Sequence, residues 1–447
     1  MKPLKLRDCL SEKVDYYRQP EAIIQAVDEL NNQFANDSID IVSLQNYNPR
    51  SHFEAPITYE IKSYTTLHNH VVIDCCVFTA SHYIGRFTNG EVSIAISPRF
   101  GNKIFNYLIS YATNLYIPIG QSDIETGINS NSYWLIGLLW KSTLNKALTV
   151  GQIPKEYQTI TNNQKSYRGR LNVNKHIHAN ICNASRFYCT YKKLSMDNVI
   201  NNTIRCAYKT LKSKGLSSLL SEFEEYDKRL ESLGVSSTVD PSLLSTIRYT
   251  RMTAPYQPVI NLSKTILANK YAESSENSNK LACSYFIDMS EIWEMYLLKV
   301  LQNNLPKRYT IYSPNSATGI FLLENNMREI RPDIIIELNG RVLVIIDAKY
   351  KNYHLLGKTA AEGVQREDLY QMSTYLYHYG TSNKAIAGIF TSPVSCREQN
   401  VFCLNHNDLH HIGLINLNIE DKETPIETHF EEISYAKRIE DILKRIE

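Results

Sequence analysis

Two short and nearly continuous apolar runs in the C-terminal third form the clearest hydrophobic pattern of the chain. They are IIIEL at 334–338 and VLVII at 342–346, and Asn339-Gly340 lies between them. Strands that helices cover on both sides are apolar on both faces, and Asn-Gly favours a two-residue hairpin turn. The pattern therefore predicts a buried β-hairpin inside a sheet.

Predicted helices and a further strand surround this hairpin. Two segments have apolar positions at helical spacing and a third is a short apolar run: 288–301, 366–379 and 385–393. Asp288 can cap the first helix, with Glu291 completing a capping box, and Gly380 can end the second helix in a left-handed conformation. This order of elements predicts an α/β sandwich over residues 276–447.

The preceding part of the chain divides into two regions. Residues 1–125 are predicted to form a β-rich domain, with a strand at 71–80 and a hairpin around Asn89-Gly90. Residues 126–275 are predicted to form a mostly helical domain. Helical patterns lie at 106–116 in the first region and at 132–148, 197–213 and 218–233 in the second. The predicted fold class is therefore α/β, or α+β overall, with three domains.

Composition indicates an ordinary globular protein. Of 447 residues, 43% are hydrophobic and 21% are charged, which argues against disorder. A net charge of only +2 means that nucleic-acid binding would need a local basic patch. Residues 167–195 are basic and rich in Asn and Tyr, and they form either a contact surface for DNA or a partner chain, or a solvated surface.

The cysteines and the apolar segments bear on the cellular compartment. Nine scattered cysteines without a C-x-x-C pair are typical of a reducing cytosol. One cluster, Cys403, His406, His410 and His411, suggests zinc, but a second cysteine at ligand spacing is missing. The N-terminus lacks the apolar core of a signal peptide, and no apolar run approaches the roughly 20 residues that span a bilayer. We therefore expect a soluble, cytoplasmic protein without membrane contact.

Charged residues at the ends of the apolar hairpin carry the candidate chemistry. Carboxylates such as Asp333 and Asp347 are rarely buried unless a cation or a partner compensates them. A divalent metal removes their repulsion, and Mg²⁺ prefers one or two carboxylates with water and phosphate oxygens. Lys349 leaves its strand on the same face as Asp347 and can act on a water or a phosphorane-like transition state. The combination favours phosphodiester hydrolysis; the alternative is a surface salt bridge at strand ends.

The hairpin register decides whether these side chains meet. With a strict two-residue loop, Leu338 would face Arg341 and Asp333 would face Ile346, so Asp333 would point away from Asp347. A three-residue loop, or a bulge near Pro332-Asp333, would restore the parity. We predict this odd register.

Two motifs in this region resemble those of a nuclease superfamily. Pro332-Asp333 followed by D-A-K at 347–349 resembles the PD-(D/E)XK signature, and DLYQMSTYL at 368–376 resembles the Q-x-x-x-Y element of its RecB-like branch. A wider match is to the McrC family, the nuclease subunits of McrBC modification-dependent restriction systems. The similar segments are 83–101, 167–177, 186–195, 197–211, 288–301, 331–336, 342–351 and 368–376. The resemblance implies that residues 276–447 form a PD-(D/E)XK nuclease domain.

The resemblance also implies roles for individual residues. Asp333 and Asp347 would bind one or two Mg²⁺ ions, with the carbonyl of Ala348 as a further ligand. Lys349 would act on the nucleophilic water, and Gln371 would position the scissile phosphate or that water.

Further positions in the same region have weaker assignments. Tyr375 would support the site, and Glu294 matches a position where some relatives have an acidic metal ligand, although a surface residue of its helix fits equally. The loop 350–366 would either hold DNA phosphates or form an exposed mobile loop. Its basic residues are Lys351, His354, Lys358 and Arg366.

The family resemblance also implies partners. The chain has no G-x-x-x-x-G-K-[ST] motif, so GTP would be bound by a partner, a McrB-like AAA+ GTPase hexamer, and not by this chain. The implied function is that of a Mg²⁺-dependent, type IV restriction-like endonuclease subunit in anti-phage defence. It would cleave double-stranded DNA with methylcytosine-type modification and stimulate the GTPase. Residues 1–275 would then be mainly a docking arm.

Two alternatives remain open at this stage. The chain could be a non-cleaving adaptor that activates an AAA+ motor and retains a vestigial nuclease fold. It could also be a stand-alone PD-(D/E)XK nuclease that needs no nucleotide.

Overall fold

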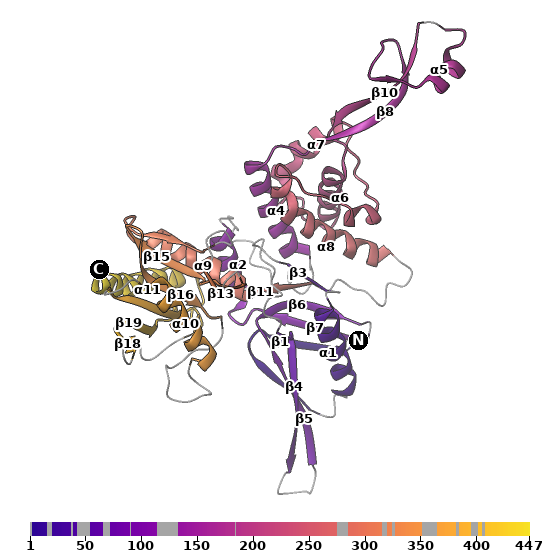
Figure 1. Ribbon diagram of the computed structural model, residues 1–447. Helices are drawn as coiled ribbons and strands as arrows, with labels where there is room; N and C mark the ends of the chain where they lie inside the picture. Colours follow the sequence, from indigo (N-terminus) through magenta and orange to yellow (C-terminus); the bar gives the residue numbers. More distant parts are fainter. Residues whose placement is uncertain are drawn as a thin grey trace. The chain divides into compact units, whose positions relative to one another are not determined.

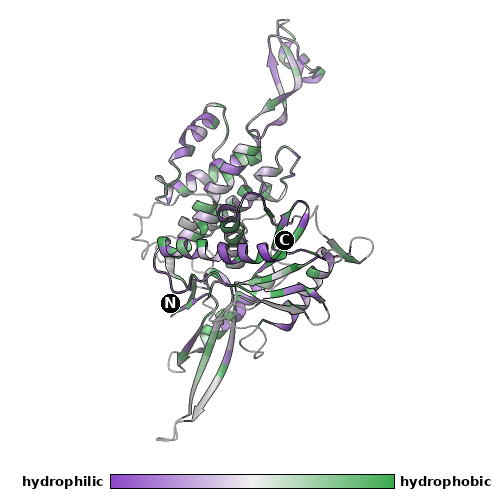
Figure 2. Cartoon of the chain, turned by 90° about the vertical axis from the view of Figure 1, so that its left-hand side faces the viewer, coloured by the Kyte–Doolittle hydropathy of each residue, from purple (hydrophilic) through white to green (hydrophobic). Residues whose placement is uncertain are grey.

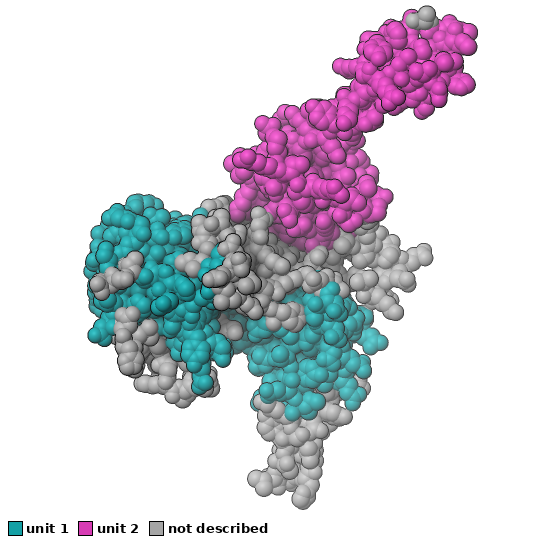
Figure 3. Space-filling view, viewed as in Figure 1, with its two compact units in different colours: residues 1–128, 279–447 teal, residues 129–278 magenta. Residues whose placement is uncertain are grey.

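The structure is a computed structural model of the chain. It describes residues 2–15, 20–36, 39–42, 54–65, 72–89, 91–113, 133–183, 185–274, 285–314, 320–323, 327–350, 364–380, 384–394, 401–404 and 407–447. The chain divides into two compact units, shown in Figure 3. Unit 1 combines residues 1–128 with 279–447, and unit 2 is residues 129–278. Among the described helices, none is both long and apolar enough to cross a lipid bilayer.

In the described residues, the N-terminal part of unit 1 consists of two sheets and two helices (Figure 1). The five-stranded sheet has the order β1 (Lys2–Arg7), β7 (Val92–Ser97), β6 (Tyr83–Thr88), β11 (Tyr285–Asp288) and β3 (Asp40–Val42). The three-stranded sheet has the order β2 (Ser11–Asp15), β5 (Val72–Ala80) and β4 (Ile57–Thr65), and the helices are α1 (Pro20–Ala35) and α2 (Gly101–Thr113). The predicted strand at 71–80, the hairpin over 83–96 and the helix near 106–116 are confirmed, with the helix beginning earlier.

Strand β11 joins the two ends of the chain within unit 1. It pairs antiparallel with β6 and parallel with β3, although it lies immediately before the first helix of the C-terminal part. The N-terminal sheet is therefore completed by a strand from the C-terminal third. Segments far apart in sequence consequently share one fold.

The C-terminal part of unit 1 is built around a six-stranded mixed sheet. Its order is β12 (Thr310–Tyr312), β15 (Ile334–Leu338), β16 (Arg341–Ala348), β17 (Ile386–Thr391), β19 (Asn407–Leu414) and β18 (Val401–Leu404). The helices are α9 (Met289–Asn304), α10 (Arg366–Tyr379) and α11 (Pro425–Ile446), and a small hairpin pairs β13 (Ile320–Leu323) with β14 (Met327–Ile330). The predicted helix, hairpin, helix and strand all appear in the predicted order.

The central strands of this sheet are buried on both faces, as their continuous apolar runs predict. All six residues of β17 are buried, and so are the last six of β16. Helix α10 packs on the face that carries Ile345, through Met372 and Leu376. Helices α9 and α11 pack against each other and against β16. This core holds the ends of β15 and β16 in place.

The predicted caps have different outcomes. Asp288 caps α9, because its Oδ1 accepts hydrogen bonds from the backbone of Ser290 at 2.8 Å and Glu291 at 3.4 Å. Gly380 ends α10 as predicted, but its φ of −69° and ψ of 141° are extended, so the predicted left-handed conformation is wrong. Glycine is needed there for space, since a Cβ would lie 2.5 Å from the carbonyl oxygen of Leu376.

The described part of unit 2 contains four α-helices besides a small antiparallel sheet that carries a fifth. The helices are α4 (Tyr133–Val150), α6 (Val199–Ser213), α7 (Glu224–Ser232) and α8 (Gln257–Ser274). The sheet has the order β8 (Glu156–Gln164), β10 (Phe187–Ser195) and β9 (Arg170–Leu171), and it carries helix α5 (Val173–Asn180). The helices agree with the predicted helical character, but the sheet was not predicted. Its ribbon is largely hydrophilic in Figure 2, so the sequence lacks the alternating pattern of a half-buried strand.

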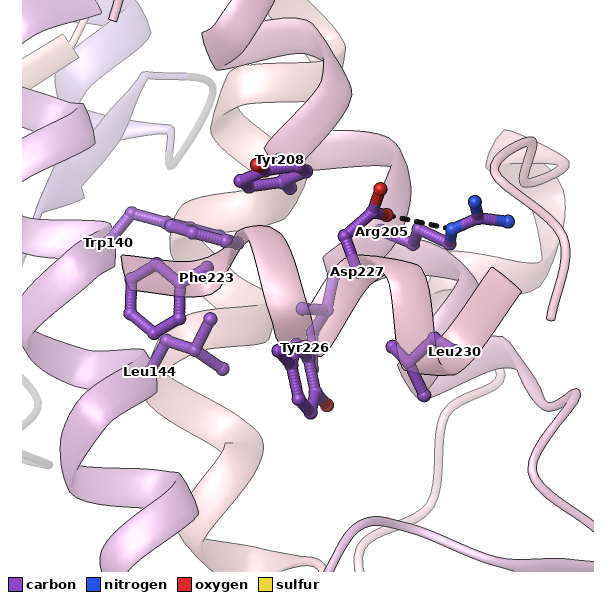
Figure 4. A pocket seen from close by; sticks show the side chains of 9 residues that line it. Trp140, Leu144, Arg205, Tyr208, Phe223, Tyr226, Asp227 and Leu230 are labelled. Atoms are coloured by element: carbon purple, nitrogen blue, oxygen red, sulfur yellow. Dashed lines mark hydrogen bonds and ion pairs between the residues drawn. The ribbon is translucent and has the colours of Figure 1, made fainter. Parts of the chain in front are cut away.

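A small cavity lies inside unit 2 (Figure 4). Its volume of ≈ 10 Å³ is about that of one water molecule. Beside it, Arg205 and Asp227 form a buried ion pair of 2.8 Å, and Asp227 also pairs with Lys209 at 2.9 Å. The cavity is too small for a nucleotide, and the buried charges are compensated by each other. This part of unit 2 is therefore a packed core and not a ligand site.

We predict that Gly388→Ala destabilises the chain by about 1–3 kcal/mol, the usual cost of overpacking a core. A Cβ at Gly388 on β17 would overlap the Sδ and Cγ atoms of the buried Met372 on α10. Urea unfolding measures the loss. Met372→Ala removes the overlapping atoms, so the double variant should lose less than the sum of the two single losses; strict additivity would contradict the contact.

Candidate active site

The hairpin β15–β16 has the predicted odd register, but it arises elsewhere than predicted. Asn339 and Gly340 have φ angles of 52° and 78°, and Leu338 pairs with Arg341, so the turn is a strict two-residue loop. The register then shifts, because Ile336 pairs with Val344 while Glu337 pairs with Val342.

Leu343 is the extra residue of this β-bulge. Beyond it, Ile334 pairs with Ile346, which places Asp333 level with Asp347 on the same face. The parity is therefore restored by a bulge within β16, and neither by a longer loop nor by a bulge near Pro332.

Asp333, Asp347 and Lys349 lie together at one edge of the sheet. The backbone N–H of Ala348 donates a hydrogen bond of 2.7 Å to Oδ2 of Asp333. Asp347 is buried, with 3% of its surface exposed, and its Oδ2 lies 3.0 Å from Nζ of Lys349. The backbone N–H of Lys349 donates to the carbonyl of Thr391 at 2.9 Å, which ties the end of β16 to β17. The sheet therefore holds all three charged groups next to one another.

The pKa values of these groups are shifted by burial and by one another. Burial, with the nearby charge of Asp347, raises the pKa of Asp333 to about 8. Burial also raises the pKa of Asp347, although Lys349 opposes this effect. Burial lowers the pKa of Lys349, but Asp347 and Asp333 outweigh it and raise that pKa above its usual value. Asp333 and Asp347 are thus costly to ionise together in the metal-free chain, and a divalent cation is suited to lowering that cost.

Glu294 belongs to the same electrostatic cluster. Its side chain is half-buried on α9, and burial followed by the charge of Asp333 raises its pKa well above the ordinary value. Asp347 contributes to the same shift. Glu294 thus lies within electrostatic reach of the two aspartates, and its assignment as a metal ligand stays a prediction.

Gln371 and Tyr375 lie one turn apart on α10, as the motif predicts, but they point to different surroundings. Gln371 is exposed, and its Nε2 donates a 2.6 Å hydrogen bond to the hydroxyl of Tyr375. Tyr375 is buried and donates a 3.0 Å hydrogen bond to the carbonyl of Arg331, two residues before Asp333. Tyr375 therefore braces the segment that leads into β15, while Gln371 is positioned at the surface.

Some predicted residues cannot be placed. Lys351, His354 and Lys358 lie outside the described residues, whereas Arg366 is exposed at the first position of α10. For the proposed zinc cluster, the side chain of Cys403 and all of His406 lie outside the description. Burial and the neighbouring His411 lower the pKa of His410. The zinc interpretation therefore remains untested.

The donor set at the sheet edge fits a hard divalent cation. Asp333, Asp347 and Glu294 offer oxygen atoms whose pKa values are raised, mainly by burial. Among the described residues, no three His, Cys, Asp or Glu side chains converge into a complete metal cage. That arrangement agrees with the preference of Mg²⁺ for one or two carboxylates together with water and other oxygen ligands.

Residues from the N-terminal part also reach this site, which the sequence did not reveal. Arg99, between β7 and α2, donates a 2.5 Å hydrogen bond to the carbonyl of Tyr350, the residue after Lys349. Its guanidinium also lies 4.4 Å from the centroid of the Tyr350 ring. The backbone N–H of Arg99 in turn donates to Oδ1 of the fully buried Asp8 at 2.5 Å. The chain that leaves the site is thus anchored by the N-terminal domain.

The raised pKa of Asp333 predicts that the stability of the metal-free chain depends on pH. The folded chain keeps a proton on Asp333 up to about pH 8, whereas the unfolded chain loses it near the ordinary value of 3.8. Folding therefore takes up a proton between these values, so the free energy of unfolding should fall as pH rises through this window, by up to about 1 kcal/mol per pH unit. Urea unfolding in EDTA at several pH values measures the slope.

Asp333→Asn removes this titration and should flatten the slope between about pH 4 and pH 8 relative to the wild type. Glu420→Gln, which changes an exposed carboxylate, serves as the control and should keep the wild-type slope. Equal slopes for the wild type and Asp333→Asn would contradict the shifted pKa.

We predict that Arg99→Gln lowers the free energy of unfolding by about 1–3 kcal/mol, because it removes a charged donor from a buried carbonyl. The exposed Arg7 on β1 of the same domain provides a matched control, and Arg7→Gln should change stability by less than about 0.5 kcal/mol. Urea unfolding compares the two variants. An equal loss in both would show that the contact with Tyr350 contributes nothing specific.

Comparison with known proteins identifies relatives of this chain. A sequence model of the family described as "McrBC 5-methylcytosine restriction system component" matches residues 78–389. The chain is also similar to the type IV methyl-directed restriction enzyme EcoKMcrBC of Escherichia coli strain K12. That similarity is 23% identity over 331 residues, which cover 70% of this chain and 91% of the relative.

Among solved structures, the fold is similar to a chain in a half-complex from the tetradecameric assembly of Thermococcus gammatolerans McrB AAA+ hexamers with bound McrC. The TM-score is 0.53 at 18% identity, covering 98% of this chain and 100% of that chain. The resemblance to McrC that the motifs indicated is thereby confirmed. Because the family model matches most of its length, the chain belongs to the family of McrBC 5-methylcytosine restriction system components, as a subunit of McrC type.

Proposed function

We propose that this chain is the DNA-cleaving subunit of a GTP-driven restriction system that acts on modified DNA. The proposal assigns it a Mg²⁺-dependent, PD-(D/E)XK-type hydrolysis of phosphodiester bonds in double-stranded DNA carrying methylcytosine-type bases. Membership of the McrBC family supports the restriction system, and the charged cluster at the end of β16 supports the hydrolysis.

The proposal rests on one observation: two carboxylates and an ammonium converge at one end of the central strands β15 and β16. A chain gains no stability from holding Asp333 and Asp347 side by side away from water, since burial raises the pKa of both and the charge of Asp347 raises that of Asp333 further. The bulge at Leu343 nevertheless places them on the same face. A cation bound in use explains why the arrangement is kept.

The cluster lies where open α/β sheets commonly bind ligands. Strands β16 and β17 run parallel, and Asp347 and Thr391 lie at their carboxyl ends. The crevice outside this edge of a sheet is the usual position of a binding site. A DNA backbone that approached the edge would meet the acidic cluster and the exposed Gln371 on α10.

Each residue has a defined role in this proposal. Asp333, Asp347 and the carbonyl of Ala348 would hold Mg²⁺, with Glu294 as a further acidic neighbour. The bound ion would polarise the phosphate and lower the pKa of an attacking water. Lys349, a protonated amine beside the carboxylates, would orient that water and stabilise negative charge on the phosphorane-like transition state. Gln371 would position the scissile phosphate, and Tyr375 would keep the segment before Asp333 in place.

The partner in the proposal is an AAA+ GTPase ring. The similar structure contains McrC bound to McrB AAA+ hexamers, and the present chain has no G-x-x-x-x-G-K-[ST] motif of its own. We therefore assign GTP binding and hydrolysis to a McrB-like hexamer, which this chain would dock on and stimulate. Recognition of the modified base would rest with that partner.

The proposal predicts that Asp347→Ala and Lys349→Ala each reduce DNA cleavage by about a thousandfold or more, while ring assembly and GTPase stimulation stay intact. The measurements are gel assays of a 5-methylcytosine-containing plasmid with partner, GTP and Mg²⁺, together with phosphate release and size-exclusion profiles. Arg7→Gln, on an exposed strand position of the N-terminal sheet, is the control for cleavage.

The outcomes separate this proposal from its alternatives. Cleavage that persists in both variants would remove Asp347 and Lys349 from the chemistry. A wild type that stimulates the GTPase but never cleaves would favour an adaptor with a vestigial nuclease fold. Cleavage by the purified chain with Mg²⁺ and no nucleotide would favour a stand-alone nuclease.

A further inference from the structure

The ammonium of Lys349 bridges two carboxylates that come from different elements. Its Nζ lies 3.0 Å from Oδ2 of Asp347 on β16 and 3.1 Å from Oδ1 of Asp368 on α10. The side chain of Asp368 is 14% exposed, and that of Lys349 is 20% exposed. Both ion pairs are therefore mostly shielded from water, where such contacts are stronger than at an open surface.

Asp368 lies on a helix that the core holds firmly. It precedes Gln371 by three residues, so the two share one face of α10. One residue further along, Met372 packs against Gly388 on β17 without room for an added carbon atom. The position of the Asp368 carboxylate is therefore set by the packing of α10 against the sheet.

A second carboxylate partner for Lys349 matters because Asp347, its first partner, would also bind the metal. In the proposed function, Asp347 would bind the metal, and its oxygens would then attract an ammonium less strongly. A lysine side chain has four methylene groups and rotates readily, so Lys349 would lose its orientation if Asp347 were its sole partner. Asp368 contacts the same ammonium from a different element, α10, and the proposed function assigns it no metal contact.

We propose that Asp368 is a positioning residue, which holds the ammonium of Lys349 beside the acidic cluster while Asp347 binds the metal. This inference rests on the proposed function, since it assigns Lys349 a part in cleavage. Asp368 lies outside the PD-(D/E)XK motif, and its role depends on the packing of α10 against β16. It acts through Lys349 and does not itself touch the reacting atoms.

A purely local explanation of Asp368 can be separated from this one. An acidic residue in the first turn of a helix interacts favourably with the partial positive charge at the N-terminus. Glu367 occupies the same first turn of α10 but is exposed. Glu367→Gln therefore removes an equivalent helix charge without touching Lys349, and it is the matched control for Asp368→Asn.

The experiment compares Asp368→Asn, Asp368→Glu and Glu367→Gln in the full chain. With the AAA+ partner, GTP, Mg²⁺ and a 5-methylcytosine-containing plasmid, Asp368→Asn should lower kcat about 100-fold, the cost of a misplaced catalytic group. The KM for DNA should change less than about twofold, because the ground-state DNA contacts are untouched. Glu367→Gln should cleave like the wild type, and Asp368→Glu, which keeps the charge, should recover at least about tenfold of the loss.

A second readout does not depend on cleavage. In the metal-free chain, acetylation of Lys349 by acetic anhydride can be followed by mass spectrometry. Loss of one of its two carboxylate partners should make Lys349 react several-fold faster in Asp368→Asn, while Glu367→Gln leaves the rate unchanged. Thermal unfolding of each variant establishes that it is folded.

The outcomes distinguish this inference from the proposed function. If the wild type cleaves and Asp368→Asn matches it in both kcat and Lys349 acetylation, Asp368 has no positioning role. An equal loss in Asp368→Asn and Glu367→Gln would reduce the effect to the helix terminus and overturn the inference. If Asp368→Asn does not fold, Asp368→Glu decides: a rate as low as that of Lys349→Ala overturns it. A wild type that does not cleave refutes the proposed function, while the acetylation rates still test the contact.

Discussion

One extra residue in a buried strand determines the geometry of the whole site. With a two-residue turn at Asn339-Gly340, an uninterrupted ladder would send Asp333 and Asp347 to opposite faces of the sheet. The bulge at Leu343 shifts the ladder by one residue and brings both carboxylates to the same face. A bulge leaves a residue unpaired and locally disrupts the hydrogen-bond ladder, which costs stability. The bulge in β16 places the two carboxylates together at the end of the strand.

At that end of the strand, tight hydrophobic packing lies next to two carboxylates that repel each other. The hydrophobic residues of β15, β16 and β17 fix the backbone, and this rigidity makes it possible to hold Asp333 and Asp347 close together despite their repulsion. A less tightly packed edge would relax by rotating one carboxylate into water. The same core therefore accounts for both the stability of the domain and the strain of its charged cluster. Binding sites are commonly built in this way, on rigid elements that hold charged groups in place.

The sequence predicted the parts of this region that depend on local patterns. The apolar runs, the Asp288 cap and the hairpin turn follow from periodicity and turn chemistry, and all appear in the structure. The sequence predicted an odd register, yet it could not place the bulge, since nothing local distinguishes Leu343 from its apolar neighbours. The sheet of β8, β9 and β10 was not predicted because β8 is polar and largely exposed on both faces, and α11 has no counterpart among the predicted elements. Contacts between elements, such as Lys349 with Asp368, leave no local signal at all.

The structure also changes how the division of labour in this chain is understood. The family resemblance implies a docking arm followed by a nuclease domain, but residues 1–128 and 279–447 form one compact unit. Strand β11 completes the N-terminal sheet and leads directly into α9, which carries Glu294. On the other side, Arg99 binds the carbonyl of Tyr350 next to Lys349. The N-terminal domain is therefore linked to two segments of the site, one through the chain itself and one through a hydrogen bond. The N-terminal domain is part of the scaffold that shapes the acidic cluster.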